Sequence, residues 1–200
     1  MSKTIFVTSG ATVPFPDMME VVMDNDFMQS CVDYGYGRII AQIGKGYADA
    51  LLGHVAALET DDSYKCSLTA QELGCEGIVT SFKLKSQSLE FIAIEFSSKI
   101  EQIITKLADL VISHAGTGSI LDSLRLNTPL IACVNEKLMD NHQQQIADKF
   151  EGLGYIIACK ANAQSLIAGI QKIQTAELKP FPKQHNIAFE NALVNVAYSL

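Results

Sequence analysis

A short segment combines glycines, hydroxyl side chains and a histidine between two apolar runs. The segment SHAGTGS, residues 113–119, follows DLVI and precedes SILDSL. Glycines let the backbone approach an anion closely, and the first amides of a helix offer unpaired donors with a partial positive charge. Serine and threonine hydroxyls can also donate to phosphate oxygens. The segment therefore predicts a phosphate-binding turn, and its candidate substrate-binding residues are Ser113, His114, Gly116, Thr117, Gly118 and Ser119.

Asp122 follows this turn, about one turn into the expected helix, where its carboxylate could accept hydrogen bonds from both hydroxyls of a ribose. A structural interpretation is equally good for the loop alone. In it Ser119 is the N-cap of the helix, and Asp122 is an acid that interacts favourably with the helix dipole. The segment is not a Walker loop, because GxxxxGK[ST] does not occur in the chain.

A second polar run, MDNHQQQ at residues 139–145, follows the apolar run LIACV. Each sugar hydroxyl can use both a donor and an acceptor. Amide and neutral imidazole side chains offer both, and carboxylates accept, so Asn141, His142, Gln143 and Gln144 are candidate substrate-binding residues. For this run alone, a helix capped by Asp140 or Asn141 with a solvated polar face is the better interpretation.

A third candidate turn, TSGAT at residues 8–12, follows the first apolar run. Its small residues could let the chain approach a diphosphate, with Gly10 and Thr12 lining the site. Taken alone, a purely structural turn is the better interpretation.

Short β-rich runs alternate with helical patterns, which predicts an α/β, Rossmann-like fold with a mainly parallel sheet and helices on both faces. Ligands of such sheets bind beyond the carboxyl ends of the strands, where all three candidate turns fall. We expect one nucleotide-sugar-binding domain over 1–179, with 60–81 as an irregular surface insertion. The expected strands are 4–8, 38–43, 89–96, 110–113, 130–134 and 155–159, and the expected helices are 18–32, 47–58, 99–107, 119–126, 141–153 and 164–173.

The C-terminal residues 180–200 are expected to form a tail and a partner-docking helix. Pro180 and Pro182 break the chain before a helix from about residue 186. Apolar residues then recur at helical spacing, a stripe that could equally pack on the domain itself. This stripe consists of Phe189, Leu193, Val196 and Leu200.

Composition excludes several classes of protein. The net charge of -7, from Lys+Arg 15 against Asp+Glu 22, argues against nucleic-acid binding. The five cysteines have no CxxC or metal-site spacing, which indicates free thiols in a reducing compartment. No apolar run reaches the roughly 18–20 residues of a membrane span, and the N-terminus does not read as a signal peptide. We expect a cytosolic chain, or one held at a membrane by another molecule.

The triplet Asp24-Asn25-Asp26 has the DxD form of a metal-binding glycosyltransferase motif. It follows the helical pattern MMEVVM, so a solvated helix C-terminus is the preferred interpretation. We therefore expect no protein-bound metal ion and no cofactor.

Together, HAGTGSILDSL, the following NTPLI and MDNHQQQIADKF resemble the donor-binding half of GT-B glycosyltransferases. More closely, they are similar to the family of soluble subunits of two-subunit UDP-N-acetylglucosamine transferases in dolichol-linked oligosaccharide synthesis. FVTSGATVPFP, QIGKGY and LKPFPKQHN match the fungal form of that family, so the resemblance covers nearly the whole chain.

This resemblance implies a function. Members of the family transfer GlcNAc from UDP-GlcNAc to GlcNAc-diphosphodolichol on the cytosolic face of the endoplasmic reticulum, which forms the chitobiosyl lipid. A membrane-anchored partner supplies the acceptor-binding half of the heterodimer. By position, residues 116–119 would hold the diphosphate, Asp122 the ribose, and 141–144 the sugar and phosphates, with Gly10 and Thr12 near the acceptor. Asp122 stands where the bacterial relative has a glutamate.

The catalytic base stays unassigned at this point, and we expect it from the partner or from the cleft between the halves. His114 is a weak candidate, because a histidine before such a loop is as often a local hydrogen-bonding group. Two other functions remain open. One is a non-catalytic nucleotide-sugar-binding module, and the other is a homodimeric nucleotide-sugar enzyme such as an epimerase, for which no acid–base pair stands out.

Overall fold

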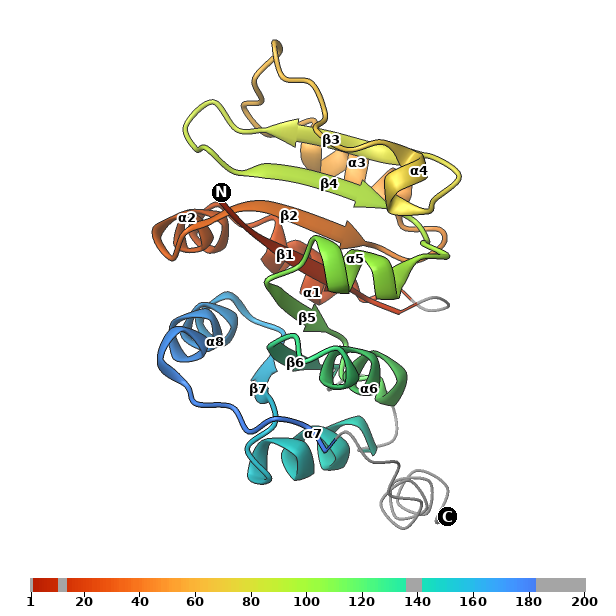
Figure 1. Cartoon of the computed structure of the whole chain (residues 1–200). Helices are drawn as coiled ribbons and strands as arrows, with labels where there is room; N and C mark the ends of the chain where they lie inside the picture. Colours follow the sequence, from red (N-terminus) through yellow and green to blue (C-terminus); the bar gives the residue numbers. More distant parts are fainter. Residues whose placement is uncertain (1, 11–13, 136–141, 183–200) are drawn as a thin grey trace.

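A seven-stranded, mostly parallel sheet forms the centre of the computed structural model, which describes residues 2–10, 14–135 and 142–182 (Figure 1). Its strand order is β3-β4-β2-β1-β5-β6-β7, and only β3 runs antiparallel to its neighbour. The strands are β1 Lys3–Thr8, β2 Tyr36–Gln42, β3 Ile78–Lys83, β4 Glu90–Ile94, β5 Leu110–Ser113, β6 Leu130–Val134 and β7 Ile157–Lys160. The predicted α/β, Rossmann-like fold is confirmed.

The later strands lie on both sides of β1 in the sheet. It first builds β2 and β4 on one side of β1, and then places β5, β6 and β7 on the other side. The boundary between β1 and β5 is therefore a topological switch point, where the loops that follow the two strands diverge. In open parallel sheets this is the position at which ligands bind.

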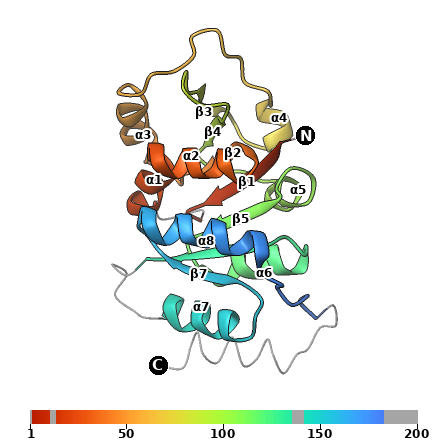
Figure 2. The same cartoon turned by 90° about the vertical axis from the view of Figure 1, so that its left-hand side faces the viewer.

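Helices cover both faces of the sheet. Figure 2 looks onto the face that α1, α2 and α8 cover. Alternate residues of β1 belong to opposite faces: Ile5 and Val7 pack in the core cluster of α1, α2, α3 and α8, while Phe6 packs with α5, α6 and α7. The helices are α1 Pro16–Val22, α2 Asn25–Asp33, α3 Ala48–Val55, α4 Ala70–Leu73, α5 Ile100–Lys106, α6 Thr117–Arg125, α7 His142–Gly152 and α8 Ala163–Thr175.

The predicted single helix over 18–32 is wrong, because it is interrupted before Asp24. The Asp24 carboxylate Oδ1 accepts hydrogen bonds from the backbone amides of Asp26 (2.9 Å) and Phe27 (3.2 Å). Asp24 is therefore the N-cap of α2, and the Asp24-Asn25-Asp26 triplet opens a helix instead of ending one. The pattern of apolar residues continues through both helices, so periodicity alone did not reveal the break.

The prediction that 60–81 is an irregular insertion is also wrong in part. Thr69 and Glu72 form a capping box that starts α4, and Gly74 ends it with a φ of 63°. The chain then enters β3, which pairs with β4 at the edge of the main sheet. The segment therefore contributes a strand to the domain.

Glu90 ties the remainder of this segment to the sheet, at the amino end of β4. Its carboxylate accepts hydrogen bonds from Arg38 Nε (2.6 Å), from the backbone amide (2.9 Å) and hydroxyl (2.7 Å) of Ser67, and from the Tyr64 hydroxyl. Burial alone would raise the pKa of Glu90, but the hydrogen bonds from Tyr64, Arg38 and Ser67 hold that pKa below its ordinary value.

Replacing Glu90 with glutamine should lower the free energy of unfolding by about 2 kcal/mol at pH 7, because Arg38 loses its charged partner and an NH2 group replaces one of the two acceptor oxygens. Since the folded-state pKa is lowered, the contribution of Glu90 is complete above the unfolded-state pKa and is lost as pH falls through the folded-state pKa. Urea unfolding at pH 7 and in acid measures the free energy of unfolding of wild type and of Glu90→Gln. The difference between the two proteins should be smaller in acid. The exposed Glu177→Gln variant is the control and should match wild type.

Three further expectations concern other parts of the chain. The expected helix over 186–200 lies outside the described residues. No described helix is both long and apolar enough to span a bilayer. All five cysteines are free thiols, as predicted, with Cys31, Cys133 and Cys159 buried.

Candidate functional site

The three candidate turns follow β1, β5 and β6, which are adjacent parallel strands. Their carboxyl ends therefore meet at one edge of the sheet, on both sides of the switch point. α6 begins at Thr117, directly after the β5 turn, and α7 begins at His142, after the β6 loop. The turn at 113–119 and the start of the amide-rich helix thus lie at the same edge, as the sequence predicts.

The start of α6 leaves several backbone amides without a helical acceptor. Gly116 is the N-cap, with φ −68° and ψ 136°, and no side chain caps the helix. The first helical hydrogen bond runs from the Ile120 amide to the Gly116 carbonyl (3.0 Å). The amides of Thr117, Gly118 and Ser119 therefore remain available to an anion. The alternative in which Ser119 is the N-cap is wrong.

His114 lies tightly between two glycines of different turns. A Cβ at Gly116 would meet His114 Nε2 at 2.3 Å, and a Cβ at Gly10 would meet His114 Cε1 at 2.9 Å. Burial lowers the pKa of His114, an effect partly offset by the Thr8 backbone. The lowered pKa favours the neutral imidazole, which offers one N–H donor and one acceptor nitrogen.

Several buried polar atoms near this edge have no hydrogen-bond partner among the described residues. They include Ser113 Oγ, His114 Nδ1 and Gln143 Oε1, and Ser113 is fully buried at the end of β5. Buried polar atoms are nearly always paired in folded proteins, because an unmet hydrogen bond costs free energy. Unpaired atoms from both turns at one edge therefore fit a site in which a polar ligand supplies the partners.

Asp122 lies in the second turn of α6 and is half-buried. Burial raises the pKa of this carboxyl, Glu101 raises it further, and Arg125 lowers it. The carboxylate is thus partly removed from water while α6 packs its buried face, Ile120 and Leu124, on the sheet. This position suits an acceptor for ligand hydroxyls.

Only some of the remaining candidate substrate-binding residues are among the described residues. Thr12 and Asn141 lie outside the described residues, and of His142 only the helical backbone is described. Gln144 Nε2 donates to Asp148 Oδ1 (2.6 Å), one turn along α7. This bond favours the structural interpretation for Gln144, whereas the carbonyl oxygen of Gln143 has no hydrogen-bond partner among the described residues.

Sequence reasoning did not identify two buried residues that organise this edge. Gln42, the last residue of β2, is fully buried and bonds to the turn after β1. Ser97 donates its hydroxyl to the Leu73 carbonyl (2.6 Å) and accepts from the Lys99 amide (2.9 Å). A glutamine directly after the apolar run Ile39–Ala41 was the available signal for Gln42. Ala115, with a φ of 62°, carried no such signal, because glycine is the residue expected at that angle.

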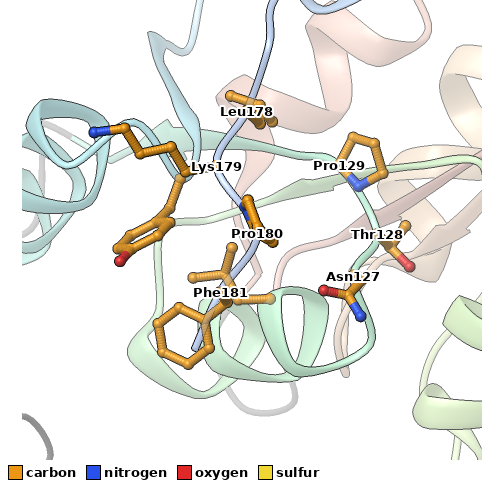
Figure 3. Close-up of a pocket in the computed structure, with 9 residues that line it drawn as sticks. Asn127, Thr128, Pro129, Leu178, Lys179, Pro180 and Phe181 are labelled. Carbon is orange, nitrogen blue, oxygen red and sulfur yellow. The ribbon is translucent and has the colours of Figure 1, made fainter. Parts of the chain in front are cut away.

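A separate pocket lies at the opposite edge of the sheet, near the amino ends of β6 and β7 (Figure 3). Asn127, Thr128 and Pro129 line one side of it, and the tail residues 178–181 line another. The Phe181 ring packs 5.4 Å from the Tyr155 ring, which holds the start of the tail on the domain. This pocket is remote from the candidate turns.

Substituting Ser113 with alanine should leave the free protein as stable as wild type, or raise its melting temperature by about 2–4 °C, because a buried hydroxyl without a described partner is removed. Binding of a phosphate ligand should weaken in the same variant. Thermal unfolding with and without ligand measures both effects. Ser97→Ala, which deletes a satisfied buried hydroxyl, should instead lower the melting temperature. Destabilisation by Ser113→Ala to the same extent would contradict a ligand-facing role.

Comparison with known proteins identifies the family of the chain. Residues 4–197 match the family model described as glycosyltransferase family 28 C-terminal domain. UDP-N-acetylglucosamine transferase subunit ALG13 of Saccharomyces cerevisiae is 47% identical over 197 residues, which cover 98% of this chain and 97% of that protein.

Two solved structures are similar in fold. The NMR solution structure of ALG13 has a TM-score of 0.73 at 47% identity and matches 98% of both chains. The crystal structure of Acinetobacter baumannii MurG has a TM-score of 0.60 at 12% identity, over 98% of this chain and 50% of that one. The chain therefore belongs to glycosyltransferase family 28, in the part described as its C-terminal domain.

Proposed function

We propose that this chain is the donor-binding subunit of a transferase that moves GlcNAc from UDP-GlcNAc to GlcNAc-diphosphodolichol, forming the chitobiosyl lipid of N-glycan precursors. Two features at the switch-point edge carry the proposal. They are the open amides at the start of α6 and the buried polar atoms, from Ser113 to Gln143, that have no partner within the described ranges. The similarity to a UDP-N-acetylglucosamine transferase subunit names the donor.

Each group at this edge has a proposed role. The amides of 117–119, with the Thr117 and Ser119 hydroxyls, hold the diphosphate at the positive end of α6. The Asp122 carboxylate accepts from the ribose hydroxyls. Gln143 accepts from a sugar hydroxyl through its carbonyl oxygen, for which the described part of the chain offers no partner. His114 and Ser113 complete the hydrogen bonds of the proposed site. The proposal includes no resident metal or cofactor.

Transfer breaks the bond between sugar C1 and the diphosphate oxygen while the acceptor hydroxyl attacks C1 from the opposite face. The configuration at C1 therefore inverts in a single displacement. Negative charge grows on the departing UDP, so donors already fixed at the start of α6 stabilise the transition state without reorganisation. The acceptor's proton goes to a base that we assign to the partner or to the cleft between the two polypeptides.

The partner is proposed to be a membrane-anchored subunit that binds the lipid acceptor. The similar yeast protein is itself called a subunit, which is in keeping with a second polypeptide. In this arrangement the partner holds the chain at the cytosolic face of the endoplasmic reticulum, in keeping with the lack of a bilayer-spanning helix among the described residues.

The test is transfer of radiolabelled GlcNAc from UDP-GlcNAc to a GlcNAc-diphosphate lipid. The chain would be assayed alone, with its membrane partner, and with the partner after Asp122→Ala. We expect transfer only with the paired wild-type chain. Binding of UDP-GlcNAc without transfer in the paired complex would instead indicate a non-catalytic binding module.

A further inference from the structure

Gln42 is a fully buried polar residue at the carboxyl end of β2, beside the candidate site. Its Nε2 donates to Thr8 Oγ1 (3.2 Å) and to the Gly10 carbonyl (3.1 Å), both in the turn after β1. Its Oε1 accepts from the Ser97 amide (3.0 Å), in the loop after β4. The carboxamide therefore uses both of its hydrogens and its oxygen to join loops from two other strands.

The backbone of Gln42 strengthens the same connection. Its carbonyl accepts from the Ser9 amide (3.1 Å) and from the Ser9 hydroxyl (3.2 Å). The Thr8 hydroxyl, in turn, also accepts from the Gly10 amide (3.1 Å). Gln42 thus forms hydrogen bonds with each of residues 8–10.

The other side of this turn contacts the site. Gly10 has a φ of 89°, and its Cα lies so close to His114 that any added Cβ would collide with the imidazole. His114 in turn fills the space over Gly116, the N-cap of α6. A continuous set of contacts therefore leads from the Gln42 carboxamide, through Gly10 and His114, to the start of α6.

We propose that Gln42 is a positioning residue for the donor site: its carboxamide holds Gly10 against His114 and so sets where the imidazole lies relative to the amides of α6. This inference rests on the proposed function for its ligand. It does not require that Gln42 touch the donor. The role requires a carboxamide, since a carboxylate of the same shape would face the Gly10 carbonyl with a second acceptor.

The test compares Gln42→Glu with wild type in two measurements on the full chain. Calorimetry gives the dissociation constant for UDP-GlcNAc, and a carbon–proton NMR spectrum gives the His114 Cε1–H resonance, assigned from its loss in His114→Gln. We expect the dissociation constant to rise about 10-fold or more, because a glutamate cannot donate the two hydrogen bonds of Gln42 Nε2. The His114 resonance should shift as well. Gln171→Glu, an exposed glutamine on α8, is the control and should change neither quantity.

If Gln42→Glu does not fold, Thr8→Val replaces it, because it removes the hydroxyl acceptor and keeps a β-branched shape. A folded variant of either kind that is less stable but keeps the wild-type dissociation constant would overturn the proposal, whether or not His114 shifts. Weaker binding with an unmoved His114 would overturn it as well. If wild-type protein binds no UDP-GlcNAc, the proposed function fails, and the His114 resonance then decides whether Gln42 positions that ring.

Discussion

Gly116→Ala should weaken binding of UDP-GlcNAc by about 100-fold or more, because it displaces groups from the centre of the site by an ångström or so. The new Cβ would stand 2.3 Å from His114 Nε2 and 2.7 Å from Cε1, far inside contact distance. The imidazole cannot retreat toward Gly10, whose backbone already lies against the ring. Either His114 or the N-cap of α6 must move, and both belong to the proposed donor site.

The matched control for this variant is Gly152→Ala, near the end of α7. A Cβ there meets no heavy atom within 4 Å, and the residue is exposed. Calorimetry should therefore give the wild-type dissociation constant for Gly152→Ala. Wild-type affinity in folded Gly116→Ala would contradict the assignment of the α6 N-terminus as the diphosphate site.

Asp122→Asn should weaken binding of UDP by about 10- to 100-fold, the usual worth of hydrogen bonds to a charged acceptor. The variant keeps the size of the side chain and removes its charge. Its effect should be confined to the ribose, so wild type should bind UDP better than 2′-deoxy-UDP, and Asp122→Asn should lose that preference. An undiminished preference in the variant would remove Asp122 from the ribose site.

The same carboxyl predicts a pH dependence. Because burial, with Glu101, raises the pKa of Asp122, the carboxylate form is lost at a higher pH than for an ordinary aspartate. The affinity of wild type for UDP should therefore decline, relative to that of Asp122→Asn, as pH falls toward and through that raised pKa. Calorimetry of both proteins across this acid range measures the difference.

Much of the second half of the fold was predictable from local sequence. The strands at Leu110–Ser113 and Leu130–Val134 were predicted with their observed bounds, because short buried apolar runs end there at turn-forming residues. The turn at 113–119 was predicted because glycines and hydroxyl residues stand between a strand and a helix. Parallel pairing of β5 with β6 then brings this turn and the amide-rich run to one edge.

The first half was harder to predict, because its structure depends on contacts between distant residues. The break at Asp24 leaves the apolar pattern intact, and β3 becomes a strand only through its pairing with β4. The hydrogen-bond partners of the Gln42 carboxamide lie 32 to 55 residues away in the sequence. Residues adjacent to Gln42 in the sequence therefore could not predict these bonds. The contact of His114 with Gly10 and Gly116 likewise emerges only when β1 and β5 lie side by side.

The most direct measurement is an amide NMR titration of the full chain with UDP-GlcNAc. If the turn after β5 and the start of α7 form one donor pocket, the amides of 116–119 and of Gln143 should shift together, with one dissociation constant. Shifts gathered instead around Asn127, Tyr155 and Phe181, at the opposite edge of the sheet, would contradict the account.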